Sequence, residues 1–117
     1  MKKLIALASL GLVLGAVHAR AAGAIVGYIS DEKCALSGAK ASKASEWIKP
    51  AAFEECAKTC LKEGAEAVFV TEDNKILKFD AASKKAIAAH VGHKVSVTGK
   101  VQGTIITIDT ITDLKLQ

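Results

Sequence analysis

The chain is poor in aromatic residues and almost free of proline. Of its 117 residues, five are aromatic and one is proline. So few rings leave the core to Val, Ile, Leu and Ala side chains, and offer little for stacking against nucleic-acid bases. The sequence also lacks a Gly-x-Ser-x-Gly motif, a phosphate-cradling glycine loop and a spaced pair of acids on a recognisable scaffold. We therefore expect a protein that is not an enzyme.

An apolar run long enough to span a membrane is also missing. The longest one, residues 4–17, follows two lysines, precedes small residues and has no cysteine beside it to carry a lipid anchor. A bilayer span needs about 20 residues, whereas this pattern is typical of a cleavable secretion signal. Residues 1–21 are therefore predicted to be a signal peptide, cleaved after Ala19 or Ala21. We expect a periplasmic or secreted protein with no membrane span after cleavage.

Net charge argues against a nucleic-acid partner. The chain has 16 basic and 12 acidic residues. The predicted signal holds three of the basic residues (Lys2, Lys3 and Arg20) and no acidic one, so 13 basic residues would remain against 12 acidic. Single-stranded nucleic acid requires a basic groove with stacking rings. We expect the partner to be an unidentified envelope ligand or protein, with no nucleic acid.

The remaining segment, residues 22–117, alternates between short β-branched runs and helical stretches. Five strands are predicted, over residues 24–29, 67–71, 75–79, 93–101 and 104–111. One helix is predicted to begin at Pro50 and to end before Gly64, and a second to cover residues 81–89. Residues 31–49 show little periodicity and are predicted to form a loop.

This order of elements predicts an OB-fold, a small, partly open Greek-key barrel. The expected domain, residues 22–117, is mainly β with two short helices, and its first helix is an insertion between strands 1 and 2. A two-layer α+β sheet is the alternative. Gly27 and Gly99 fall mid-strand, where such a barrel bends or backbones approach closely. By strand parity, Val95, Val97 and Val101 should point into the barrel.

Three blocks of the sequence also carry a resemblance. They are Gly-Tyr-Ile-Ser-Asp-Glu-Lys-Cys at 27–34, Cys-Ala-Lys-Thr-Cys at 56–60, and His-Val-Gly-His-Lys-Val-Ser-Val-Thr-Gly at 90–99. Together they resemble a family of small secreted bacterial proteins of unknown function. The resemblance implies an OB-like barrel and export, and brings no established activity. Members of that family often place a histidine soon after the first cysteine, and this chain has none between His18 and His90.

The three cysteines are the strongest chemical signal. In an oxidising compartment thiols tend to pair, but two cysteines four residues apart on one helix are poorly aimed at each other. A disulfide between Cys34 and Cys60 is favoured, because Cys34 follows the first strand and Cys60 precedes the antiparallel second strand. Cys34–Cys56 is the alternative pair. In the favoured pairing, Cys56 is expected to be a buried, inert thiol on the apolar side of its helix.

A soft-metal site is the rival interpretation. Two thiols at i and i+4 of a helix, joined by a third thiolate or a histidine, bind Cu(I) or Zn(II). The candidate ligands are Cys34, Cys56, Cys60, His90 and His93. A thiol-redox protein is the second alternative, although Cys-x-x-Cys spacing is absent.

The histidines and the single tryptophan also have structural interpretations. His93 shares the strand parity of Val95 and is expected to cap the barrel interior. His90 lies near the end of the alanine-rich helix, where a histidine suits the helix dipole. Trp47 is expected to plug the barrel mouth, or alternatively to form an exposed ligand platform. The sequence thus favours an exported, disulfide-stabilised binding or structural domain without cofactor, and its ligand face is not identified.

N-terminal sequencing of exported protein should begin at Arg20, Ala22 or Gly23, because the small residues before them fit a signal-peptidase site. Recovery of soluble cytoplasmic protein that still starts at Met1 would contradict the predicted export.

Overall fold

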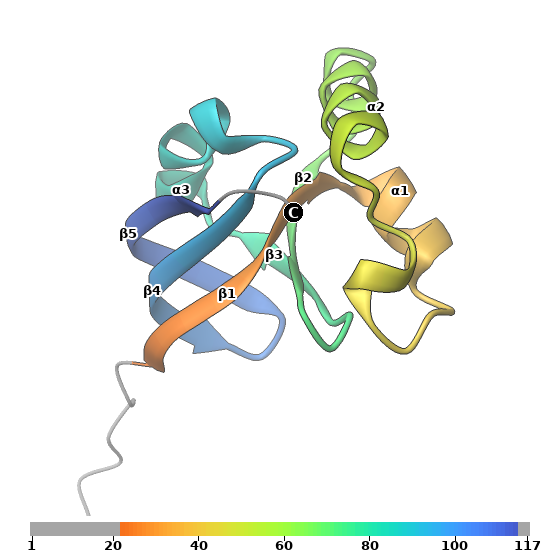
Figure 1. The fold of residues 1–117 in the computed structure, drawn as a ribbon. Helices are drawn as coiled ribbons and strands as arrows, with labels where there is room; N and C mark the ends of the chain where they lie inside the picture. The colour runs from red at the N-terminus through yellow and green to blue at the C-terminus, as the bar shows by residue number, and fades with distance from the viewer. Residues whose placement is uncertain (1–21, 115–117) are drawn as a thin grey trace, which may run out of the picture.

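The computed structural model describes residues 22–114, which form five strands, three α-helices and two 3-10 turns (Figure 1). The strands are β1 (Ala22–Asp31), β2 (Ala67–Thr71), β3 (Ile76–Phe79), β4 (Lys94–Gln102) and β5 (Ile105–Leu114). The α-helices are α1 (Glu32–Gly38), α2 (Pro50–Lys62) and α3 (Ala81–Ala86), and the 3-10 turns are η1 (Ala44–Glu46) and η2 (Ala88–His90). The predicted signal segment, 1–21, lies outside the described residues.

The strands close into a ring in the order β1-β2-β3-β5-β4, which is the strand order of an OB-fold barrel. β1 joins the two halves of the ring, since Gly27 pairs with Thr71 of β2 on one side and with Val95 of β4 on the other. The ring is uneven, because β3 and β5 share a short parallel seam while β4 and β5 pair along nearly their whole length. The predicted OB-like barrel is confirmed, and the short seam closes a ring that was expected to be partly open.

Aliphatic side chains and two phenylalanines fill the barrel, because alternate residues of each strand point inward. The buried strand residues of this core are Ile29, Phe69, Leu77, Phe79, Val95, Val97 and Ile106. Ile87 and Val91 join them from the segment that holds α3 and η2. Val97 is fully buried, as its parity predicts.

Val101, by contrast, is 39% exposed, so the prediction that it points inward is wrong. Burial in β4 alternates up to Gly99 and then ends, since residues 100–102 are all exposed. Beside Gly99 the β4–β5 register skips Asp109 of β5, and the two backbones approach closely at this bulge. A Cβ at Gly99 would overlap the carbonyl oxygen of Thr107, so only glycine permits this approach. The expected close backbone approach at Gly99 is thus confirmed.

A second core covers the outer face of β1 and β2. It is built from the segment between these strands and contains Tyr28, Ala35, Ala44, Ile48, Phe53, Val68 and Val70. Trp47 packs against this core, edge-on to Phe53 with ring centroids 6.0 Å apart. Both predictions for Trp47 are therefore wrong, because its ring lies half-buried outside the barrel against Gly38 and Phe53.

Asn74, in the β2–β3 turn, holds this segment in place. It adopts a left-handed φ of 65°, as the predicted tight turn requires. Its side-chain amide donates to the carbonyls of Gly38 and Ala41 at 2.7 and 2.8 Å, and its Oδ1 accepts from Trp47 Nε1 at 2.8 Å. The turn therefore fixes the end of α1 and the tryptophan together.

Two helical details differ from the sequence-based prediction. Residues 31–49, predicted as a loop, contain α1 and η1. The alanine-rich helix ends at Ala86 and is followed by η2, so His90 lies in a 3-10 turn. Figure 1 places α1 and α2 together on one side of the barrel, with α3 on the other.

Val97→Asp should abolish folding or lower the free energy of unfolding by more than about 3 kcal/mol, because it buries an unpaired charge. Ser96→Lys, one residue away and partly exposed, should cost less than about 1 kcal/mol. Urea denaturation followed by circular dichroism measures both. Equal effects at the two positions would contradict the assigned strand parity.

Candidate metal centre

The three cysteines gather where α1 packs against α2. Cys34 lies in the first turn of α1, directly after β1. Cys56 and Cys60 lie one turn apart on α2, and side chains at i and i+4 share a helix face. The three sulfur atoms all lie within 4.8 Å of one another, and the sulfurs of Cys34 and Cys56 are 3.0 Å apart.

Asp31 positions Cys34, the first thiol of the cluster. It is the last residue of β1 and the N-cap of α1, and its Oδ2 accepts the backbone N–H of Cys34 at 2.9 Å. Asp is among the best N-cap residues because its oxygen satisfies an otherwise unpaired helix donor. The side chain is fully buried, and its second oxygen, Oδ1, has no hydrogen-bond partner. A buried, unpaired carboxylate oxygen is costly.

The thiols and this carboxylate influence one another. Burial, followed by the Cys56 thiol and the Asp31 carboxylate, raises the pKa of Cys34 far above its ordinary value. Burial and the negative charge of Asp31 likewise raise the pKa of Cys60. These groups therefore resist ionising together, which favours protonated thiols unless a cation lies among them.

A hollow of about 340 Å³ opens beside Cys34. Its other lining residues are Lys33, Ser37, Gly38 and Trp47. Cys56 is exposed, and Cys34 and Cys60 are half-buried. The sulfur cluster is therefore accessible from outside while its carboxylate is not.

The predicted Cys34–Cys60 disulfide stays a prediction. All three cysteines are free thiols, and no sulfur pair is at bonding distance. The 3.0 Å contact joins the alternative pair, Cys34 and Cys56. The expectation of a buried Cys56 is wrong, because only Phe53 and Ala57 of α2 are buried in the core and Cys56 lies beside that stripe.

The histidines form a group of their own. His90 Nδ1 and His93 Nδ1 lie 2.6 and 3.2 Å from the same oxygen, Oδ1 of Asp113 in β5. His93 Nε2 lies 3.2 Å from Oε1 of Glu54 in α2. Burial raises the pKa of Asp113, but the hydrogen bonds from the two imidazoles outweigh it, so the pKa is lowered and the carboxylate stays ionised.

The five predicted metal ligands thus separate into a thiol cluster and a histidine cluster. The expected role of His93 as a cap inside the barrel is wrong. Its side chain is 29% exposed and lies at the end of the barrel against two carboxylates.

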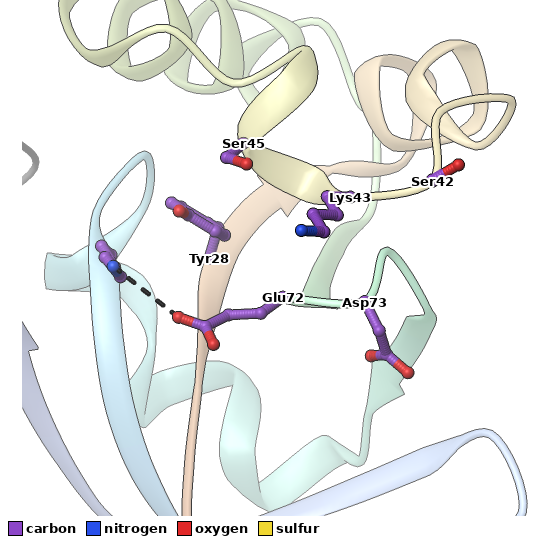
Figure 2. A pocket seen from close by; sticks show the side chains of 7 residues that line it. Tyr28, Ser42, Lys43, Ser45, Glu72 and Asp73 are labelled. Atoms are coloured by element: carbon purple, nitrogen blue, oxygen red, sulfur yellow. Dashed lines mark ion pairs between the residues drawn. The ribbon is translucent and has the colours of Figure 1, made fainter.

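A larger hollow, of about 500 Å³, lies elsewhere, between the insertion and β4 (Figure 2). It is lined by Tyr28, Ser42, Lys43, Ser45, Glu72, Asp73 and Lys94. Glu72 and Lys94 form an ion pair across it at 3.7 Å, and the Lys94 ammonium lies 5.8 Å from the centre of the Tyr28 ring. The lining has two lysines and two carboxylates, so its positive and negative charges balance, and it contains no thiol or imidazole.

Comparison of the chain with protein-family models, with curated proteins and with solved structures finds no match. Within residues 22–114, none of the helices is long and apolar enough to cross a membrane. The chemistry of the two clusters is thus the guide to function.

Sequence reasoning missed Asp31, Glu54 and Asp113. A signal for Asp31 was present, since Asp three residues before Cys34 is the spacing of an N-cap. Glu54 and Asp113 carry no comparable local signal, because only the folded barrel brings them to the histidines.

Asp31→Asn should speed alkylation of Cys34 and Cys60 by iodoacetamide in reduced, chelator-treated protein. Removing the carboxylate charge lowers both thiol pKa values, so more thiolate forms at a given pH, while Asn still caps α1. Mass spectrometry across a pH series measures each cysteine. Asp80→Asn, which alters the N-cap of α3, is the matched control and should leave both rates unchanged. An unchanged rate in Asp31→Asn would show that its charge does not reach the thiols.

Proposed function

We propose that this protein is an exported, non-enzymatic binding domain whose ligand is a thiophilic metal ion, with zinc as the best fit. Cys34, Cys56 and Cys60 supply three thiolates, and the buried Asp31 carboxylate adds negative charge close to Cys34 and Cys60. The observation that carries the proposal is the convergence of the three cysteine sulfurs within 4.8 Å of one another.

The sulfur geometry supports one shared ion. Sulfur atoms bound to one tetrahedral zinc, at a Zn–S distance of about 2.3 Å, lie about 3.8 Å apart. The three sulfurs lie within 4.8 Å of one another, with one pair at 3.0 Å. The sulfurs are therefore already near the spacing that one shared ion requires.

The charge of the site favours zinc over copper. Three thiolates beside the buried Asp31 carboxylate carry four negative charges. A dication offsets this charge more fully than Cu(I) does. It would reverse the mutual repulsion that raises the pKa of Cys34 and Cys60, because a metal-bound thiol ionises readily.

A structural disulfide uses the same sulfurs and is the competing state. In an oxidising envelope, thiols this close would pair unless an ion or a reductant held them apart. A bridge would place no positive charge beside the buried Asp31 carboxylate, whereas a dication among the sulfurs supplies one. That difference favours the metal.

Titration of reduced protein with Zn²⁺ should show one zinc ion bound per chain by the cysteine thiolates. Binding should also raise the melting temperature. A free zinc concentration 100 times Kd would add about 2.7 kcal/mol of stability. Cys34→Ser, Cys56→Ser and Cys60→Ser should each remove this stabilisation, and Asp31→Asn should weaken it. Asp80→Asn is the control and should bind zinc as the unmutated protein does.

Thiol counting on protein taken directly from the periplasm separates the two states. Denaturation with a chelator and without reductant should release three free thiols and at least one metal ion per chain. One free thiol and no metal would overturn the proposal in favour of the disulfide. Zinc stabilisation that is undiminished in all three cysteine variants would overturn it as well.

A further inference from the structure

We propose that His90, His93 and Asp113 form a second metal site, separate from the thiols, for a divalent cation of borderline softness such as Zn(II), Ni(II) or Co(II). The three ligands come from η2, from the residue before β4 and from the end of β5. Glu54 of α2 stands beside them.

Three ligand atoms of these side chains converge on one point. The Nδ1 atoms of His90 and His93 lie 2.6 and 3.2 Å from Asp113 Oδ1, and all three atoms are within 4.8 Å of one another. Ligand atoms held at about 2.0–2.1 Å from one tetrahedral zinc lie about 3.3 Å apart. The cluster is thus close to ligand spacing without any backbone change.

The hydrogen bonds within the cluster leave a place for a cation. His93 donates to Asp113 and Glu54 at the same time only as an imidazolium; a neutral imidazole carries one N–H, and one of the two contacts is then a conflict. An ion bound through Nδ1 resolves this conflict: Nε2 then carries the proton and donates to Glu54. A metal-bound histidine typically gives its other N–H to a carboxylate in this way.

The position is fixed but accessible. The two imidazoles are only 21% and 29% exposed, and their rings are held edge-to-face at 6.4 Å. A hollow of about 280 Å³, lined by Glu54, His93, Asp113 and Leu114, opens onto the His93 imidazole and the Asp113 carboxylate. An ion can enter from solvent and displace few protein contacts.

The ligand types select the metal class. Two imidazoles and a carboxylate suit zinc, nickel and cobalt. They lack the sulfur that Cu(I) prefers and the all-oxygen shell that Mg²⁺ and Ca²⁺ require. This chemistry differs from that of the thiol cluster, so the two sites are separable by experiment.

Titration with CoCl₂ under phosphine reductant distinguishes them, because only thiolate-bound cobalt gives a near-ultraviolet charge-transfer band. Unmutated protein should bind two Co²⁺ ions, one with the band and one without. Asp113→Asn should weaken the ion without the band by more than about tenfold and leave the band intact. Cys34→Ser should do the reverse.

Asp109→Asn, an exposed carboxylate on the same strand, is the matched control and should bind both ions normally. His93→Gln provides a second test if Asp113→Asn unfolds. Binding of a single, band-forming Co²⁺ by the unmutated protein would show that these groups form only an ion cluster. A second Co²⁺ whose affinity is unchanged in both Asp113→Asn and His93→Gln would show the same. Failure of the thiol proposal has a different signature, in which the band is missing and the other ion still binds.

Discussion

The hydrogen bond from the backbone N–H of Cys34 to the buried carboxylate of Asp31 joins the barrel to the candidate metal centre. Asp31 ends β1 and starts α1, so one side chain sets where the strand stops and where the first thiol stands. Because β1 pairs with both β2 and β4, the position of Asp31 is fixed by the whole ring. Packing of the cysteine-bearing face of α2 against α1 then completes the thiol cluster. The barrel thus orients a site that lies outside the barrel core.

Much of the fold follows from local patterns in the sequence. The run Ala-Val-Phe-Val-Thr predicts β2 because its residues favour strands. The proline at the start of α2 predicts a helix because its φ is fixed. The Asp-Asn pair after β2 predicts a turn because both residues tolerate a left-handed backbone. Two features did not follow. α1 depends on a single cap within a stretch rich in Lys, Ser and Ala. Val101 lies beyond Gly99, where the buried face of β4 ends, and strand parity does not encode where the barrel interior ends.

The candidate sites were predictable only in part, for a related reason. Cysteine and histidine are scarce enough that their presence alone points to chemistry, and the three thiols indeed meet. Carboxylates are common on any surface, so Glu54 and Asp113 carry no signal until the β4–β5 register sets Asp113 opposite Val95, two residues from His93. The separation of thiols from imidazoles likewise depends on how α2 packs against β1 and α1, which residue spacing does not encode.

The double pairing of β1 has a consequence for how the chain is assembled. The β2–β3 and β4–β5 hairpins join neighbours in the sequence and can form early, whereas β1 has its partners far along the chain. Contacts of long sequence separation form slowly because the intervening loop must first be closed. β1 is synthesised before the other described strands, but its two pairings are complete only after β4 has been made. The ring stays open until β4 and β5, the last described strands, are available, whereas the core that anchors α1 and α2 uses only residues between Tyr28 and Ile76.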